Sequence, residues 1–457
     1  MRDLIYAVIV ALSVVVTIQS AHTLYLTLYT WNRPPSEASA PEQFQPPRLS
    51  FTVMLPARHE EAVIATTVGR VARANYPPGL MQILVICSAD DEGTIAKAEA
   101  KITELRRQGV RNVSLVVFHD KPINKPHGLN AGLAKAVMDV VTIFDAEDDI
   151  HPEIFNVVNT VMVNEQVRVV QGGVQLMNFD SSWYSALNVL EYFFWFKSRL
   201  HYHARRGATP LGGNTVFFAR DLITRLGGWD ETNLTEDADI GLRLSASGEP
   251  IRIVYDDRYV TKEETPPTIR QFIKQRTRWS QGFMQTLKKG TWRELPTGRQ
   301  RRLAVYTLAF PQAQALLGLY VPFSLLTILS LKAPVLVALV SFLPVLTLLG
   351  HFLISVVGLY EFADAHDLKV SPIAIPRLAF GWIPYQLLVS YASMRAVLRH
   401  LRGISNWEKT QHIGAHRELA DTRGLELGEE PSRVALFRQG AGEVAAGGCA
   451  AASAAGA

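Results

Sequence analysis

A run of acidic residues offers the first chemistry that this sequence could perform. Asp145–Asp149 (Asp-Ala-Glu-Asp-Asp) directly follows the β-rich run 140–144, which places several carboxylates in one short loop. Crowded carboxylates repel one another unless a cation joins them, and their oxygen atoms suit Mg²⁺ or Mn²⁺ where substrate phosphates complete the coordination. The run therefore predicts a divalent-metal site. A solvated acidic turn that caps the next helix is the alternative interpretation.

Two more motifs bring together acidic, cationic and aromatic side chains. The sequence Thr-Glu-Asp at 235–237 precedes an apolar helical pattern, where Thr235 or Asp237 could instead be a helix cap. Gln275 and Arg278 are three residues apart, and so share one helix face beside Trp279. Arginine has a planar fork for phosphate oxygens, and tryptophan has a flat apolar face for a sugar ring. A basic helix that faces a membrane is the alternative for this last motif.

Together and in this order, the motifs resemble the membrane-integrated family 2 glycosyltransferases, the group that contains bacterial cellulose, hyaluronan and poly-N-acetylglucosamine synthases. The resemblance covers about residues 50–290. It implies an α/β nucleotide-sugar-binding domain of the GT-A type, with a mostly parallel sheet flanked by helices, combined with transmembrane helices. The activity that it implies is a metal-dependent hexosyltransferase with a UDP- or GDP-sugar as donor.

The resemblance also implies a role for individual residues. Asp237, with Glu236 beside it, would be the general base that takes the proton from the acceptor hydroxyl as this oxygen attacks the anomeric carbon. Asp145 and Glu147 would hold Mg²⁺ or Mn²⁺, with Asp148 as the competing ligand. Inversion follows, so an α-linked donor gives a β-linked product. Nucleotide or diphosphate contacts are implied for Pro56, Arg58, Glu60, Asp91, Lys125, Asn130, Gln275 and Arg278, and acceptor contacts for Gly213, Asn214 and Trp279.

Two nucleotide-binding positions remain open in this comparison. Glu61 competes with Glu60 for the acidic position of the loop that contacts the base, and Asp90 competes with Asp91 after the second strand. The sequence departs from the family there, because Cys87-Ser88 occupy the place where aspartates more often end that strand.

A short segment near the end of the chain also resembles the family. Trp407, Lys409 and Thr410 match a cytoplasmic stretch that closes over the nucleotide in related synthases, which would make 403–417 a gating segment. An exposed amphipathic tail is the alternative interpretation.

The elements that must position these residues alternate between strand and helix patterns. Alternation of this kind predicts a largely parallel sheet covered by helices, with ligand sites at the carboxyl ends of the strands. The predicted strands are 51–55, 82–87, 113–118, 140–144 and 167–171, and the predicted helices between them are 62–74, 95–108 and 128–138.

Apolar and polar stretches divide the rest of the chain. Residues 1–33 predict a transmembrane helix, for which a cleaved signal peptide is the alternative. Arginines before and after the region 303–402 both look cytoplasmic, so its three apolar segments (303–331, 334–360 and 373–398) should make an even number of crossings. The remaining predicted divisions are a linker at 34–49, the catalytic domain at 50–268 with an amphipathic membrane-interface helix at 183–203, interface helices at 269–302, and a disordered tail at 418–457.

Composition supports a hybrid of soluble domain and membrane spans. The 457 residues are 48% apolar and 19% charged, too apolar for a typical soluble protein and too charged to lie in the membrane throughout. The only cysteines, Cys87 and Cys449, make a disulfide framework implausible and fit a reducing compartment. The net charge of +4 is too small to indicate nucleic-acid binding.

These observations favour a multi-pass inner-membrane enzyme with a cytoplasmic catalytic domain. The leading hypothesis is processive synthesis of a β-linked polysaccharide coupled to its passage through the membrane, with accessory export proteins as further partners. A non-processive transferase with a lipid acceptor is the alternative among enzymes. The alternative from another class is a non-catalytic transport or scaffold protein whose α/β domain only binds nucleotide. Neither the donor sugar nor the linkage follows from the motifs, because all such donors share the diphosphate.

Overall fold

The computed structural model describes residues 2–31, 33, 39–331, 333–404, 406–408, 414 and 416–417. Met1–Gly414 forms one compact unit, and Ala415–Ala457 forms a second unit in which only His416 and Arg417 are described. The tail predicted at 418–457 therefore lies outside the described residues. So do Lys409 and Thr410 of the predicted gating segment.

A seven-stranded sheet forms the centre of the α/β domain, with strand order β3-β2-β1-β4-β7-β5-β8. Its strands pair in parallel except β7, which is antiparallel to both β4 and β5. A parallel pair, β6 and β9, forms a second small sheet. The strands are β1 (Phe51–Ala57), β2 (Met81–Ser88), β3 (Val113–Phe118), β4 (Val140–Ile143), β5 (Val169–Gly172), β6 (Val174–Leu176), β7 (Val216–Ala219), β8 (Ile251–Val254) and β9 (Thr261–Glu263).

All five predicted strands are present, which confirms a mostly parallel α/β sheet. The prediction omitted β6, β7, β8 and β9, which are only three or four residues long. Runs this short give only a weak pattern, so that some are detected, as β4 and β5 of four residues were, and others are not. Their pairing also comes from distant parts of the chain.

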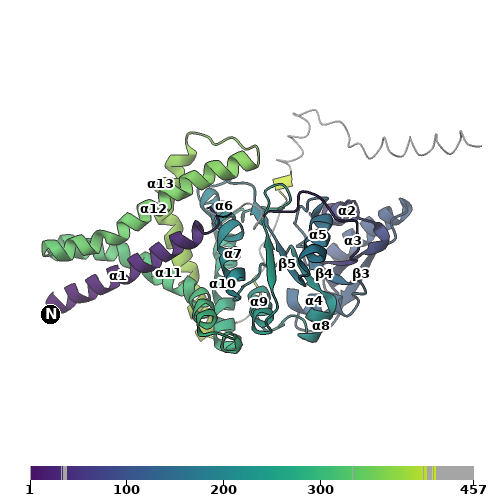
Figure 1. The fold of residues 1–457 in the computed structure, drawn as a ribbon, viewed down its shortest axis with the longest axis horizontal. Helices are drawn as coiled ribbons and strands as arrows, with labels where there is room; N and C mark the ends of the chain where they lie inside the picture. The colour runs from purple at the N-terminus through teal and green to yellow at the C-terminus, as the bar shows by residue number, and fades with distance from the viewer. Residues whose placement is uncertain are drawn as a thin grey trace, which may run out of the picture. The chain divides into compact units, whose positions relative to one another are not determined.

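Helices cover both faces of the sheet (Figure 1). Alternate residues of β1 belong to different cores: Phe51, Val53 and Leu55 to one apolar cluster, and Met54 to the other. Side chains of a strand alternate between faces, so a sheet covered on both faces has apolar residues at successive positions. The helices are α2 (Ile64–Ala72), α3 (Glu92–Arg107), α4 (Lys125–Leu133), α5 (Ile154–Glu165), α6 (Ser185–Phe194), α7 (Leu200–Arg206), α8 (Arg220–Arg225), α9 (Glu236–Ala246) and α10 (Ile269–Lys289), with short helical turns η2 (Pro78–Leu80), η3 (Trp195–Arg199) and η4 (Thr291–Glu294).

Helix α4 begins three residues before the predicted start at residue 128. Asn124 is its N-cap and accepts a hydrogen bond from the backbone N–H of His127 at 3.0 Å. Pro126 fits the first turn, where a backbone N–H would have no partner in the helix. As a result Lys125 lies at the N-terminal end of the helix.

The stretch 183–203 is buried within the protein. It forms α6, a π-helical turn η3 and the start of α7. Leu187, Leu190 and Phe193 belong to one apolar cluster with Phe362 and Tyr385 from the C-terminal helices. Protein therefore covers the apolar face of this stretch, which its sequence predicts at the membrane interface.

Three long helices follow the α/β domain and match the three predicted apolar segments. They are α11 (Gly298–Leu331), α12 (Val335–Ala365) and α13 (Ala374–Leu401), and α10 packs against both α11 and α13. The N-terminal helix α1 (Arg2–Thr27) lies beside α12 (Figure 1), where His351 Nε2 is 3.0 Å from the Ser20 carbonyl oxygen. By length and composition alone, α1 and α12 are the two helices in the described part of the chain that could cross a membrane.

Candidate active site

A cavity of about 580 Å³ opens at the carboxyl ends of β1, β2 and β4 and continues between α6, α10, α11 and α13. It collects most of the residues that the sequence motifs single out. The predicted residues that line it are Pro56, Arg58, Glu60, Lys125, Asp145, Glu147, Gly213, Asn214, Glu236, Asp237, Gln275, Arg278, Trp279 and Trp407. Asp91 and Asn130 are absent from the lining.

Asp237 reaches the cavity from the first turn of α9. Its Oδ1 accepts a hydrogen bond from the backbone N–H of Ala238 at 2.8 Å. A Cβ added at Gly213 would lie 3.2 Å from Asp237 Oδ2 and 3.6 Å from Lys125 Nζ, so the glycine allows the loop to approach both groups.

Burial raises the pKa of Asp237 and of its neighbour Glu236. The charge of Asp237 raises the pKa of Glu236 further, while Lys125 and Arg278 lower both. A buried carboxylate with a raised pKa binds a proton more readily than an exposed one. Asp237 therefore has the surroundings of a proton acceptor.

A second group of carboxylates lies around the loop that follows β4. Asp145 is paired with Lys125 Nζ, and the backbone N–H of Asp145 donates to Asp148 Oδ2 at 2.7 Å. Asp148 is fully buried, and Asn214 Nδ2 donates to its Oδ1 at 2.9 Å and its Oδ2 at 2.8 Å. The same Asn214 amide donates to Glu263 at the end of β9. Asn214, predicted to contact the acceptor, thus joins two carboxylates.

Glu263 is a member of this group that the sequence motifs did not indicate. Burial together with the charges of Glu147 and Asp145 raises its pKa, and burial together with Glu263 raises the pKa of Asp148. Its only local signal is its place at the end of a three-residue strand, more than a hundred residues from Asp145.

The donor set fits a divalent cation. Asp145, Glu147 and Glu263 all line the cavity, and Asp148 lies behind them. Burial, and after it the repulsion among these carboxylates, raises the pKa of Asp148 and Glu263, and a bound Mg²⁺ or Mn²⁺ would offset both effects. A separate group of potential metal ligands consists of His59 and Glu61, in the loop after β1, and Asp91, after β2.

Cationic and amide groups face the cavity from the opposite side. Arg278 lies over the ring of Trp407 with its guanidinium carbon 4.4 Å from the ring centroid, and its Nε has no hydrogen-bond partner among the described residues. Gln275 is 9% exposed, and within the same part of the chain its Oε1 has no partner either. Unpaired polar groups in a buried site carry an energetic cost that a polar ligand would remove.

The loop after β1 is held in place by Asp91. His59 has a left-handed backbone (φ 54°), and its N–H donates to Asp91 Oδ2 at 2.5 Å. Asp91 also caps α3 through the N–H of Thr94. Asp91 is 3% exposed, so its carboxylate supports the loop from behind, whereas Ser88 at the end of β2 lines the cavity.

Asn130 also holds a neighbouring loop in place. Its amide donates to the Trp229 carbonyl at 2.9 Å and to Glu231 at 2.8 Å, and its Oδ1 accepts from the Trp229 N–H at 2.9 Å. These bonds use its polar atoms, which explains why Asn130 does not face the cavity as the resemblance implied.

The segment around Trp407 is fastened to the end of α13. Arg395 makes two hydrogen bonds to Glu408, at 2.6 and 2.7 Å, and Arg399 lies 3.4 Å from the same carboxylate. This pairing places Trp407 over Arg278 and so at the cavity wall.

Aromatic and apolar side chains line the far end of the cavity. Trp279 lies beside Tyr192, with ring centroids 6.2 Å apart. The lining from α10, α11 and α13 includes the apolar residues Phe283, Phe310, Pro311 and Val389. The cavity therefore has a charged end at the strands and, among the helices, an aromatic end that also holds the ion pair of Arg276 with Glu191.

Comparisons with known proteins agree with this arrangement. A family model described as "Glycosyltransferase like family 2" matches residues 46–282, which is more than half of the chain. Probable glycosyltransferase YdaM of Bacillus subtilis is 28% identical over 242 residues, covering 50% of this chain and 54% of that protein. The poly-β-1,6-N-acetyl-D-glucosamine synthase of Staphylococcus epidermidis is 25% identical over 290 residues, covering 63% and 66%.

Two further comparisons give a relative named for a glycolipid product and a solved structure. A β-monoglucosyldiacylglycerol synthase of Nostoc is 25% identical over 236 residues, covering 51% of this chain and 49% of that protein. The chain thus spans about half to two thirds of the length of these relatives. The mannosyltransferase PcManGT of Pyrobaculum calidifontis, solved with GDP-Man and Mn²⁺, shares the fold with a TM-score of 0.60 at 18% identity, covering 87% of this chain and 98% of that one. By the match of the family model, this chain belongs to glycosyltransferase family 2.

Proposed function

We propose that this family 2 glycosyltransferase is an inverting, metal-dependent enzyme that adds a sugar from a nucleotide sugar to a growing β-linked glycan. One observation carries the proposal: Asp237, the carboxylates of Asp145 and Glu147, Arg278 and the aromatic ring of Trp279 all line a single cavity. The charged end suits a sugar diphosphate, and the aromatic end suits a sugar chain.

The residues divide the reaction between them. Asp237 takes the proton of the acceptor hydroxyl, whose oxygen forms the new bond to the anomeric carbon. The bond from this carbon to the diphosphate breaks on the opposite face, and the leaving diphosphate keeps the electron pair. Lys125 and Arg278 stabilise the negative charge that develops there. A cation held by Asp145, Glu147 and Glu263 would add electrostatic stabilisation of the same diphosphate.

A lipid acceptor is the second candidate function. It rests on the apolar lining that Phe283, Phe310 and Val389 contribute. The relatives point both ways, because one is named for a glycan product and another for a diacylglycerol product. A single transfer to diacylglycerol would replace chain extension in this case.

We place the enzyme in the inner membrane with its α/β domain in the cytoplasm. Helices α1 and α12 have the length and apolar composition of membrane spans. Nucleotide sugars are cytoplasmic donors, so a domain that binds them belongs in the cytoplasm. Both arginine groups that flank 303–402 lie on that side only if a second crossing accompanies α12 in this region. Passage of the glycan through the membrane, coupled to its synthesis, belongs to the same proposal.

The test uses the full-length protein in detergent with a panel of UDP- and GDP-sugars, Mg²⁺ or Mn²⁺, and glycan or diacylglycerol acceptors. We expect one donor to give nucleoside diphosphate and a ladder of products, and EDTA to stop both until metal is restored. One added sugar at every donor concentration, on diacylglycerol alone, would establish the second candidate. Product formation unaffected by EDTA would refute metal dependence.

A further inference from the structure

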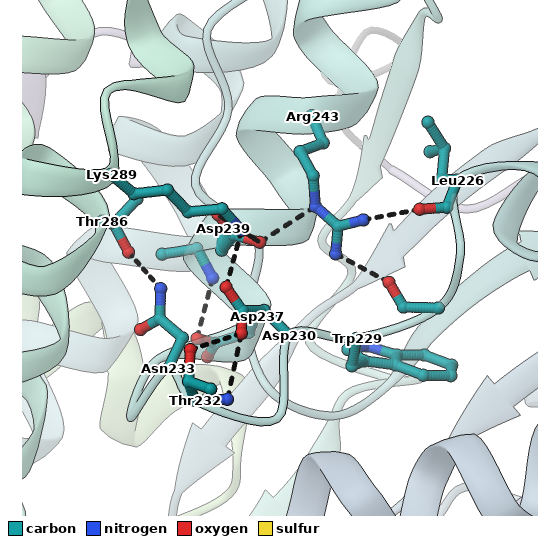
Figure 2. Close-up of polar contacts among 12 residues, drawn as sticks. Leu226, Trp229, Asp230, Thr232, Asn233, Asp237, Asp239, Arg243, Thr286 and Lys289 are labelled. Atoms are coloured by element: carbon teal, nitrogen blue, oxygen red, sulfur yellow. Dashed lines mark hydrogen bonds and ion pairs between the residues drawn. The ribbon is translucent and has the colours of Figure 1, made fainter. Parts of the chain in front are cut away.

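An ion-pair cluster behind the active site connects α9 to α10 (Figure 2). Asp239 is two residues after Asp237, so the two side chains leave α9 about 200° apart. Asp239 is fully buried and accepts from Lys289 Nζ at 2.9 Å and from Arg243 Nε at 2.9 Å. Lys289 is the last residue of α10, the helix that carries Gln275, Arg278 and Trp279.

The same cluster holds the loop that precedes α9. Lys289 Nζ also donates to Asp230 at 2.6 Å. Arg243 donates to the carbonyl oxygens of Leu226 at 2.8 Å and Gly228 at 2.7 Å. Two cations and two carboxylates are therefore paired in a partly buried site, so that the buried charge of Asp239 is compensated.

Three closer contacts continue this connection toward Asp237. Asn233 Nδ2 donates to Thr286 Oγ1 at 2.8 Å, and the Leu234 N–H donates to Gln285 Oε1 at 2.9 Å. Gly282 allows α10 to approach the residue that caps α9, since an added Cβ would lie 2.6 Å from the backbone nitrogen of Thr235.

The loop also reaches the helix that carries Lys125. Asn130 of α4 binds the backbone of Trp229, and His127 Nδ1 lies 2.8 Å from Glu231. The three cavity groups Lys125, Asp237 and Arg278 thus stand on three helices, and a continuous set of polar contacts connects those helices behind the cavity.

We propose that Lys289 and Asp239 are positioning residues, which set Asp237 on α9 at a fixed distance from Arg278 on α10. The inference rests on the proposed role of Asp237 as the base. Transfer requires the acceptor hydroxyl between the base and the leaving diphosphate, so a small shift between the two helices slows the reaction even where both side chains remain.

Lys289→Met removes the ion pairs from α10 to Asp239 and Asp230 but leaves Arg243 paired with Asp239. We expect kcat per folded enzyme to fall about tenfold or more, because misplaced catalytic groups lose rate steeply, while the donor KM changes by less than about twofold. Lys289→Arg should restore kcat to within about threefold, since a guanidinium can reach both carboxylates. The neighbouring Lys288→Met removes the same charge from the exposed end of α10 and should leave kcat unchanged.

The outcomes separate this inference from the function on which it rests. If Asp237→Asn abolishes transfer but Lys289→Met matches Lys288→Met in kcat and differs only in thermal midpoint, the pair is merely structural and the positioning role is refuted. A failure of Lys289→Arg to restore kcat would also count against it. If Asp237→Asn keeps full activity, the proposed base itself is wrong.

Discussion

The carboxylates of the cavity are held where ionisation is unfavourable. Burial raises the pKa of Asp237, Glu236, Asp148 and Glu263, whereas exposed carboxylates such as Asp221, paired with Arg168, have lowered pKa values. An acid with a raised native pKa binds protons more tightly in the native than in the unfolded state. Stability therefore falls as pH rises through the window between the ordinary and the raised value.

This dependence of stability on pH gives a prediction for Asp237→Asn. We expect transfer to drop by about a thousandfold, a typical contribution of a general base, while the thermal midpoint at pH 8 rises above that of the wild type. The substitution removes a desolvated charge that also repels Glu236. The gain should disappear as pH falls below the raised pKa of Asp237, where the wild-type carboxyl is protonated. Activity and thermal unfolding measured from pH 4 to 8 check both effects.

Asp221→Asn is the matched control for this prediction. Its ion pairs with Arg168 and Arg225 lower the native pKa, so the substitution should not raise the midpoint at pH 8. If the thermal midpoint of Asp237→Asn exceeded that of the wild type by the same amount at every pH, the effect would not come from the charge of Asp237.

The sequence predicted which residues of the local motifs line the cavity. It did not predict side-chain contacts with residues far away in the chain. Asp145, Glu147, Asp237 and Arg278 all line the cavity as expected. The resemblance implied that Asp91 and Asn130 contact the nucleotide, but their side chains bond to the loops beside them. A sequence motif indicates which residues lie near the site, but it does not indicate the direction of each side chain.

At the scale of elements, α9 and α10 pack against each other and both present motif residues to the cavity. Helix α10 presents Gln275, Arg278 and Trp279 to the cavity, while its other face packs against α11 and α13. Its amphipathic pattern indicated an interface helix, but the pattern alone did not distinguish a membrane surface from a packed protein surface.

Gly282→Ala tests how closely the two helices must approach. The added methyl group would overlap with the backbone and side chain of Thr235, at 2.5 to 2.6 Å, so the helices must move apart. We expect a loss of about 1–3 kcal/mol in the free energy of unfolding, as for other overpacked contacts, together with a lower kcat. Chemical unfolding and steady-state kinetics measure these two effects.

Gly79→Ala serves as the control, because an added Cβ there meets nothing within 4 Å. It should change neither stability nor kcat. Equal effects of the two substitutions would show that α9 and α10 are not in tight contact.

At the scale of the whole molecule, the C-terminal helices complete a cavity that begins in the α/β domain. Helices α11 and α13 contribute Phe310, Pro311 and Val389 to the lining, and Phe193 and Tyr385 join the two parts in one apolar cluster. Helices α1 and α12 keep large apolar side chains exposed, among them Leu349 at 54%. Exposed apolar surface of this extent fits contact with lipid.

Membrane insertion gives a prediction at this scale. The wild type should remain in the membrane fraction after alkaline carbonate treatment. Leu349→Arg places a charge near the centre of α12, at a cost of about 2.5–3.5 kcal/mol for insertion, and should lower the inserted amount. Val137→Arg, at a 66% exposed position of the α/β domain, is the control and should leave it unchanged. Release of the wild type by carbonate would contradict the proposed spans.

The sequence by itself determined the motifs of the site and the class of the fold. The acidic run 145–149, Asp237 at a helix start and the Gln-x-x-Arg-Trp face each depend on residues within one loop or one helical turn. Period-two and helical patterns likewise act over short distances. Only the tertiary structure decided that Glu263 and Asn214 join the carboxylates, that protein covers α6, and that Lys289 meets Asp239. Those contacts join residues tens to more than a hundred positions apart, and packing of the whole unit, not local preference, brings them together.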